Sequence, residues 1–214
     1  MTSGARGVLA IWNDVRSGRE AEFEQWFQGE HLEERLSVPG FLFGRRHEAL
    51  SGSSAYFNFY VTETPAVLTA KPYLDRLNDP TPMTRKIMSE VFMNMCRTVC
   101  RRSARLTNMR GAFAVTARFN DAPDEAALTE SLRGFANNPA IANGEIWLAT
   151  DQPAGPIAAE EKLRGGDRKI KACLMADTLR QSDAERLGVV LTGQFPTADV
   201  GVFRVLCQLG HGDL

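Results

Sequence analysis

The sequence lacks the long apolar runs that mark a membrane protein. None of its 214 residues belongs to an apolar stretch approaching the roughly 20 residues that a helix needs to cross a bilayer. The opening stretch MTSGARG also lacks the apolar core of a secretory signal. We therefore expect a cytoplasmic protein without a membrane partner.

An excess of charge of one sign is missing as well. The 25 Lys and Arg residues are balanced by 26 Asp and Glu residues, which gives a formal net charge of -1. General nucleic-acid binding needs a large basic excess, so we expect no nucleic-acid partner. The hydrophobic share of 43% and the charged share of 24% are typical of a folded globule with a real core.

Cysteine is scarce, and no C-x-x-C spacing is present. Cys96 and Cys100 fall in one expected strand, where four residues separate their Cα atoms by about 13 Å. A disulfide requires Cα atoms within about 7 Å. We expect all the cysteines to be reduced and mostly buried thiols, namely Cys96, Cys100, Cys173 and Cys207.

Several motifs of known chemistry are absent. The sequence has no G-x-G-x-x-G after a strand, no P-loop, no H-E-x-x-H and no G-x-S-x-G, so nothing indicates nucleotide binding, metalloprotease or serine-hydrolase chemistry. A metal site at His31 would need a further ligand, and His47 is the one other plausible histidine. We predict no metal site.

The elements that the sequence does contain occur twice in the same order. In the first half we predict strands at 7–15, 40–50, 54–63 and 96–106, with helices at 19–37, 65–77 and 83–95. After a connector at 107–110 we predict strands at 111–119, 144–151, 169–178 and 200–209, helices at 124–137 and 182–191, and a long loop at 152–168. Each half reads β-α-β-β-α-β, the ferredoxin-like order, which indicates an internal duplication.

This order predicts an α+β fold made of two tandem ferredoxin-like units, residues 1–108 and 109–214. A single such unit covers one face of its sheet with helices and leaves the other face bare. Two bare faces can bury each other. We therefore predict that the two sheets pack face to face within one chain, as an intrachain barrel.

One stretch of the first half carries a family resemblance. Residues 26–46, WFQGEHLEERLSVPGFLFGRR, contain W-F-x-x-E-H followed by V-P-G-F-L-x-x-R-R. With the element order, these motifs resemble the dimeric α/β-barrel superfamily, and within it a tandem-repeat group of bacterial proteins related to EthD-like proteins. The fold resemblance covers the whole chain, and the motif resemblance covers residues 8–106. It implies a modest aromatic or carbonyl ligand and proton transfer. We expect no cofactor, since no haem-ligand pattern of the chlorite dismutase kind is present.

The Glu30-His31 pair raises two interpretations. On a regular helix Glu30 would point into the apolar stripe of Phe23 and Phe27, with His31 at its edge. Either the helix kinks or ends near Gly29 and leaves the pair in solvent, or the pair lines a cavity. In the second case the carboxylate would orient the imidazole as a general base or hydrogen-bond donor.

Two strands add candidate ligand-binding residues. Alternation on strand 54–63 separates an apolar set, expected to pack on the helices, from a polar set, expected to face the barrel interior. The apolar set is Phe57, Phe59 and Val61, and the polar set is Tyr56, Asn58 and Tyr60. Either a self-satisfied interior or a ligand would serve the polar set.

Two of the predicted strands carry more arginines than a solvent-exposed sheet edge needs. Arg45 and Arg46 are adjacent, so one of them must point into a packed face or a cavity. There it could pair with Glu30 or bind an anionic ligand bidentately. A further four arginines fall on strand 96–106, at positions 97, 101, 102 and 105.

Two functions follow, and we leave open whether the protein is an enzyme. The first is a cofactor-independent small-molecule enzyme or binder with its pocket in the first half. Its catalytic residues would be Glu30 and His31, and its ligand-binding residues Trp26, Arg45, Arg46, Tyr56, Asn58 and Tyr60. The second is a non-catalytic protein with a packed barrel interior and an oligomerisation surface. A homodimer of the whole chain is a candidate assembly for both.

Overall fold

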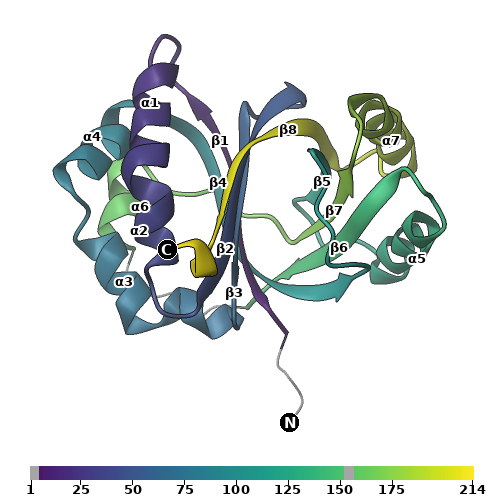
Figure 1. The fold of residues 1–214 in the computed structure, drawn as a ribbon, viewed down its shortest axis with the longest axis horizontal. Coiled ribbons are helices and arrows are strands. Elements are labelled where there is room, and N and C mark those ends of the chain that lie inside the picture. Colours follow the sequence, from purple (N-terminus) through teal and green to yellow (C-terminus); the bar gives the residue numbers. More distant parts are fainter. Residues whose placement is uncertain (1–4, 152–156) are drawn as a thin grey trace.

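The computed structural model describes residues 5–151 and 157–214. Eight strands form one closed barrel in the order β1-β3-β2-β8-β5-β7-β6-β4, and β4 returns to pair with β1. Neighbouring strands are antiparallel throughout. Helices cover two opposite sides of the barrel (Figure 1). The predicted α+β barrel is thus confirmed, and its division into units 1–108 and 109–214 stays a proposal.

The first half supplies one helix layer and four strands. Its elements are β1 (Gly7–Val15), α1 (Glu20–Trp26), the π-helix η1 (Phe27–His31), α2 (Leu32–Leu36), β2 (Phe41–Ser51), β3 (Tyr56–Thr62), η2 (Pro65–Thr69), α3 (Lys71–Asn78), α4 (Pro82–Glu90) and β4 (Phe92–Arg105). The helix predicted at 83–95 was extended too far, because Phe92 pairs with Val15 in the sheet and packs edge-on against Phe23. Tertiary pairing here overrides the helix propensity of a Met-rich segment.

The second half supplies the opposite layer. Its elements are β5 (Phe113–Phe119), α5 (Glu125–Ala136), β6 (Ile141–Ala149), α6 (Ala159–Leu163), β7 (Ala172–Thr178), α7 (Gln181–Gln194), β8 (Asp199–Gly210) and η3 (His211–Asp213). The predicted loop at 152–168 contains α6, while its residues 152–156 lie outside the described residues. Helix α6 crosses to the first half and contacts α3 and α4 (Figure 1). None of the helices in the described part of the chain is long and apolar enough to span a membrane.

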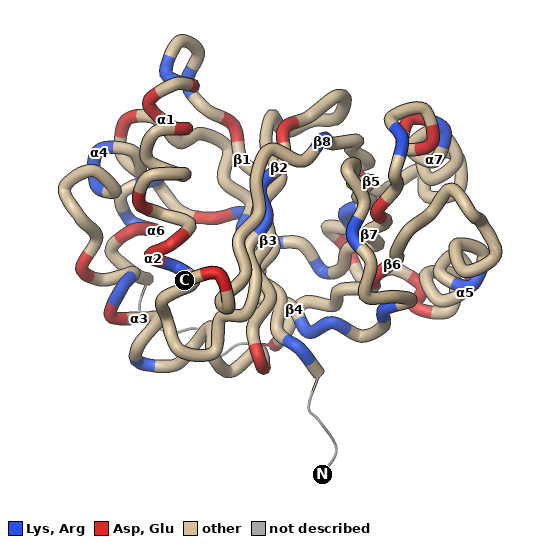
Figure 2. Tube along the Cα trace, in the orientation of Figure 1, with Lys and Arg blue, Asp and Glu red and all other residues tan. Residues whose placement is uncertain are grey.

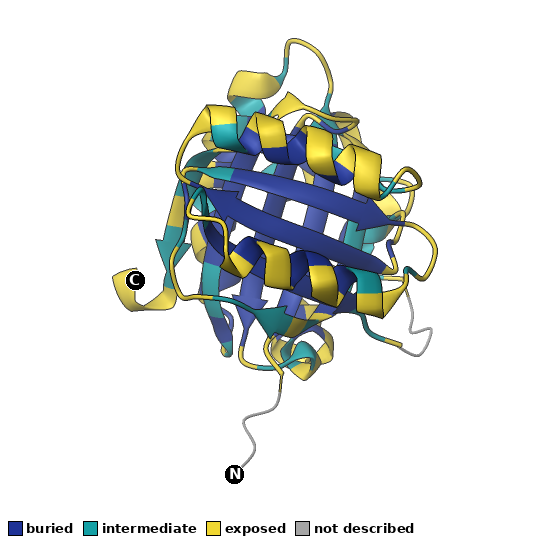
Figure 3. Ribbon diagram, turned by 90° about the vertical axis from the view of Figure 1, so that its right-hand side faces the viewer, coloured by how far each residue is buried: buried dark blue, intermediate teal, exposed yellow. Residues whose placement is uncertain are grey.

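The buried residues form three apolar layers. One cluster lies between the first-half strands and their helices, and a second lies between the second-half strands and α5 and α7. Figure 3 shows the helices of the second layer, exposed outward and buried where they meet the strands. The third cluster fills the barrel interior with large side chains, among them Trp12, Phe57, Phe59, Trp147 and Phe203.

The predicted orientation of β3 was wrong. Phe57, Phe59 and Val61 belong to the interior cluster, whereas Tyr56 and Tyr60 belong to the cluster under the helices. On the interior face the apolar set packs among other large apolar side chains. The helix-covered face contains polar partners and a cavity, and it can accommodate hydroxyl and amide groups.

One glycine in each half lets a helix approach the sheet closely. A Cβ on Gly44 of β2 would lie 2.7 Å from Leu32 and 2.9 Å from Tyr60. A Cβ on Gly144 of β6 would lie 2.7 Å from Leu132 of α5. A side chain at either position would displace the side chains that now pack against the glycine.

Candidate functional site

The helix that carries Glu30 and His31 neither ends nor kinks into solvent at Gly29. It continues from α1 through the π-turn of η1 into α2. A π-turn holds one more residue than an α-turn, so the residues after it are rotated relative to a regular helix. This rotation brings His31 and Leu32 to the buried side and leaves Glu30 partly exposed. Turns of this kind occur frequently at functional sites.

Aromatic rings surround His31, which is only 7% exposed. Its imidazole stacks on the indole of Trp26 with ring centroids 4.1 Å apart. Phe27 lies 5.5 Å away, and Tyr60 meets the imidazole edge-on at 6.4 Å. The imidazole is therefore held in a fixed orientation by packing.

No hydrogen bond or ion pair joins Glu30 to the imidazole among the described residues, and His31 Nδ1 has no partner there. Glu30 Oε1 accepts hydrogen bonds from the hydroxyls of Thr81, at 2.5 Å, and Thr84, at 2.9 Å. Thr84 in turn accepts from the indole nitrogen of Trp26 at 2.9 Å. Glu30 therefore acts on His31 indirectly, by fixing the threonine that holds the stacking indole.

A small cavity lies beside His31, between the sheet and the helices. Its volume is about 30 Å³, and its walls are largely apolar, with Leu9, Ile11, Phe27, Leu77, Met88, Phe92 and Met95 among them. Four buried polar atoms on its walls have no hydrogen-bond partner among the described residues. They are His31 Nδ1, Arg35 Nη1, Asn58 Oδ1 and the Tyr60 hydroxyl oxygen. Buried polar groups are nearly always paired, so this group of unpaired atoms is the site's distinctive feature.

Cationic groups border the cavity on the side of α6. Arg35 of α2 forms a buried ion pair with Glu160 of α6. Arg164 binds Asp167 through two hydrogen bonds, of 2.7 and 2.8 Å. Three guanidinium groups line the cavity (Arg35, Arg97 and Arg164) against the single carboxylate of Glu160. The electrostatic bias favours a ligand with a negative or strongly polarised oxygen.

Burial keeps two titratable side chains of the cavity, His31 and Tyr60, neutral. The pKa of His31 lies well below its ordinary value because the ring is desolvated and because Arg35 and Arg164 are close. Burial likewise raises the pKa of the Tyr60 hydroxyl. At neutral pH the site thus presents a neutral imidazole and a protonated phenol.

The proposed pairing of Glu30 with an arginine of β2 was wrong. Arg45 points into the barrel, where its Nη1 donates to Asp177 at 2.8 Å. Arg46 points to the helix side and is fully buried. There it lies 3.7 Å from Glu24 and over three rings, those of Phe23, Phe27 and Tyr56, at 4.6, 4.9 and 4.9 Å.

Of the eight residues predicted for the site, three line the cavity: His31, Asn58 and Tyr60. Trp26 does not line the cavity, but its indole packs against the imidazole of His31, which does. Sequence reasoning missed Arg35, although its spacing of four residues from His31 places both on one helix face. It also missed Tyr73, whose hydroxyl accepts from Arg97 at 2.7 Å, and Glu160, for which no local signal existed.

A larger hollow of about 460 Å³ lies between α5 and α7. It is open to solvent, and Gln194 of α7 bridges it to Ser131 of α5 with a hydrogen bond of 2.7 Å. None of its described lining side chains contains a buried polar atom without a partner. Size alone therefore does not make it the better candidate.

Comparison with known proteins places the fold. No protein-family model and no curated protein matches the sequence. Among solved structures, an anthrone oxidase-like protein superposes with a TM-score of 0.65 at 11% identity, covering 100% of this chain and 96% of the other. A proposed monooxygenase from Fusobacterium nucleatum subsp. nucleatum gives 0.61 at 9% identity, with 98% and 96% covered. A proposed chlorite dismutase gives 0.56 at 10% identity, with 98% and 97% covered. The chain has the dimeric α/β-barrel fold of these proteins, and identities this low establish the fold alone.

Proposed function

We propose that this protein binds a small aromatic or carbonyl compound beside His31 and acts on it by proton transfer without a cofactor. The observation that carries the proposal is the convergence of four unpartnered buried polar atoms on one apolar cavity. An unpaired buried polar group costs about 1–3 kcal/mol. A ligand with an apolar body and one or two oxygens would satisfy these groups together.

Each polar group has a role in this proposal. His31 accepts the proton of an acidic C–H or O–H group. The electron pair of a C–H bond moves to the carbonyl oxygen as an enolate, whereas that of an O–H bond stays on its oxygen, and the imidazolium then returns the proton to the ligand or to water. Arg35, through its free Nη1, stabilises that oxyanion. Because the pKa of His31 is low, the transfer requires this stabilisation, and phenols and readily enolised carbonyl compounds are the fitting substrates. The Tyr60 hydroxyl and Asn58 Oδ1 orient the ligand.

The cavity must widen to admit such a ligand. Its volume of about 30 Å³ holds one or two waters, whereas ligand pockets typically measure about 300–1,000 Å³. Helix α6 has only five residues and contacts the first half mainly through α3 and α4. Displacement of α6 would open the cavity and would also break the buried ion pair between Arg35 and Glu160.

The non-catalytic alternative is favoured by one observation, the filled barrel interior. That packing does not bear on the His31 cavity, which lies on the other face of the strands. By resemblance we further propose a place in the EthD-like branch, a cytoplasmic location and a homodimer of the whole chain. A molar mass of twice the monomer value, measured by light scattering, would support the homodimer.

The test is a ligand titration read by tryptophan fluorescence, because Trp26 contacts His31. A panel of substituted phenols and 1,3-dicarbonyl compounds is titrated into the wild type, His31→Asn and Tyr60→Phe. Exchange of the acidic C–H proton of the dicarbonyl compounds with deuterated solvent, followed by NMR and compared with the rate without protein, reports proton transfer. We expect at least one compound to bind and exchange, with about tenfold weaker binding to each variant. His211→Asn, a change at an exposed histidine, is the matched control. Equal binding by all four proteins would contradict the proposal.

A further inference from the structure

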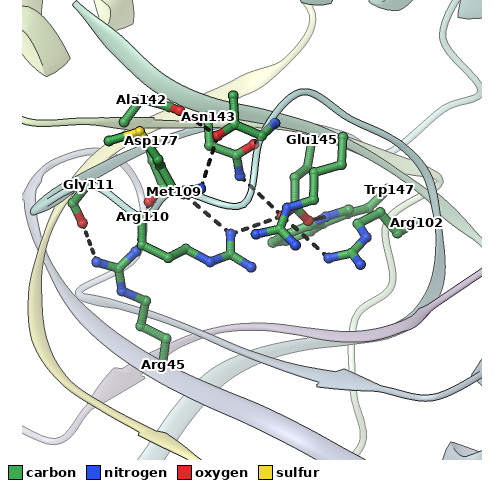
Figure 4. A network of polar contacts seen from close by, with 12 residues as sticks. Arg45, Arg102, Met109, Arg110, Gly111, Ala142, Asn143, Glu145, Trp147 and Asp177 are labelled. Atoms are coloured by element: carbon green, nitrogen blue, oxygen red, sulfur yellow. Dashed lines mark hydrogen bonds and ion pairs between the residues drawn. The ribbon is translucent and has the colours of Figure 1, made fainter.

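Four arginines meet on the barrel-interior side of the sheet, away from the His31 cavity. They surround two carboxylates near the connector between the halves (Figure 4). Figure 2 shows the basic positions of β2 and β4 that contribute to this region. We refer to Arg45, Arg102, Arg105 and Arg110 as the barrel-end arginine cluster; its carboxylates are Glu145 and Asp177.

Glu145 Oε1 is approached by more donors than it can accept. It receives hydrogen bonds from Arg110 Nη1 at 2.9 Å and Asn143 Nδ2 at 3.2 Å. Arg105 Nε lies 3.2 Å away and Arg102 Nη1 3.5 Å away. A carboxylate oxygen offers two lone pairs, and these last two nitrogens have no hydrogen-bond acceptor among the described residues. The second oxygen of Glu145 is used by the indole of Trp147, at 2.7 Å.

The charges in the cluster are also unbalanced. Four guanidinium groups against two carboxylates leave a formal charge of +2, and the ion pairs of the described residues offer these arginines no third acidic partner. The two carboxylates are fully buried, while the side chains of Arg102, Arg105 and Arg110 are 12%, 22% and 16% exposed. Three of the four guanidinium groups are thus partly exposed to solvent, whereas the side chain of Arg45 is 4% exposed.

The position of Arg110 is fixed by packing as well as by charge. Its guanidinium lies 5.4 Å from the ring centroid of Phe43 and 5.3 Å from that of Phe59. Arg45 is held between Asp177 and the carbonyl oxygen of Gly111. Preorganised guanidinium forks recognise oxyanions through paired hydrogen bonds.

We propose that the barrel-end arginine cluster binds a dianionic oxyanion group of the phosphate type, free or as a monoester. Two negative charges would balance the +2 of the cluster, and the oxygens would accept from the partly exposed guanidinium groups of Arg102, Arg105 and Arg110. This site does not depend on the function proposed for the His31 cavity, because the two lie on opposite faces of the strands.

Calorimetric titration tests the proposal directly. Inorganic phosphate and phenyl phosphate are each titrated into the full chain at constant ionic strength, with chloride as the reference anion. We expect saturable binding at one site, weakened at least about tenfold in the double variant Arg102→Gln/Arg105→Gln. Equal affinities would indicate a free-phosphate site, and a tighter monoester would indicate an organic phosphate. No saturable binding of either anion by the wild type overturns the proposal.

Matched variants distinguish anion binding at this cluster from a general effect of the protein's net charge. Arg133→Gln/Arg186→Gln removes the same charge from two highly exposed positions and should bind as the wild type does. An equal loss in both double variants overturns the proposal. Arg105→Lys keeps the charge but removes the fork, and we expect a severalfold loss. Glu145→Gln raises the positive excess, so it should strengthen binding severalfold, and a weakened Glu145→Gln protein would count against the site.

Discussion

The imidazole of His31 stacks on the indole of Trp26 with ring centroids 4.1 Å apart and an angle of 31° between the planes. The indole nitrogen is held by Thr84, and Thr84 is held by Glu30. The sequence places Glu30 next to His31, yet the path between them runs through two other side chains. Chemistry at His31 therefore depends on a helix, α4, that lies more than fifty positions further along the chain.

We expect His31→Ala to lower the free energy of unfolding by about 1–3 kcal/mol, since the ring is 7% exposed and packed between aromatic neighbours. The sequence alone predicts a smaller loss, because it treats the ring as lying at a cavity rim. Urea denaturation measures the change. His211→Ala, at an exposed position, should stay within about 0.5 kcal/mol of the wild type.

Glu30→Gln should be mild, in contrast to the about 3–5 kcal/mol expected for a broken buried ion pair. Glu30 accepts from two threonine hydroxyls and is partly exposed, and a glutamine oxygen can still accept. We expect a loss of about 1 kcal/mol in chemical denaturation. A loss of several kcal/mol would reveal a charged partner for Glu30.

Glu160→Gln should be severe. Glu160 is 3% exposed and its partner Arg35 is 2% exposed, so the change leaves a buried guanidinium without a counter-charge. We expect a loss of about 3–5 kcal/mol in the free energy of unfolding. Glu161→Gln, one position along α6, is the control, and equal effects of the two changes would show that the ion pair contributes nothing.

The free energy of unfolding should fall as the pH falls below 6.5. Burial places the pKa of His31 well below its ordinary value and lowers that of His47 to about 3, with Arg45 adding to the latter shift. Between these values and 6.5 the unfolded state binds protons that the folded state does not. Each ring then contributes up to about 1.4 kcal/mol per pH unit. Denaturation between pH 7 and 5 should show a shallower slope in His47→Gln than in the wild type.

Thiol labelling should distinguish one cysteine from the other three. Cys96, Cys100 and Cys173 are buried, Cys207 is half-buried, and all four are free. Burial raises the pKa of Cys100 to about 12 and raises those of the others as well. We expect slow labelling of Cys207 alone in the native protein, and of all four after unfolding. A loss of two thiols in the denatured protein would indicate a disulfide.

Much of the fold could be predicted from periodicity and turn signals. The first strand was placed at its observed bounds, and the alternation on β3 separated the correct two sets of residues. Which set faces which layer could not be predicted, because alternation defines two faces but not what covers them. The observed answer depends on the barrel closing on both sides of β3, which is a property of strands far apart in the chain.

The candidate site could be predicted only in part, because local patterns can be read from the sequence and contacts between distant segments cannot. His31 and Tyr60 emerged from local patterns, since each follows from its place on one helix or strand. The π-turn at η1 has no simple sequence signature, and it moved Glu30 away from the position that a regular helix predicts. Glu160 reaches the site from helix α6, more than a hundred positions along the chain from Arg35, and only the folded chain brings it there.

The closure of the barrel determines when the protein can fold during synthesis. Strand β2 pairs with β8, so that Phe43 lies opposite Gly210. A ribosome therefore makes β2 early and supplies its neighbour only after residues 199–210 have emerged. Until then β2 is an unpaired edge strand, and Phe57 and Phe59 lie on a sheet face that is not yet covered. Chaperones bind such surfaces, and such surfaces are prone to aggregation. Because the last contacts to form span almost the whole chain, folding should be slow for its size. Nascent chains stalled before β8 should be protease-sensitive in the strands that are protected in the complete barrel.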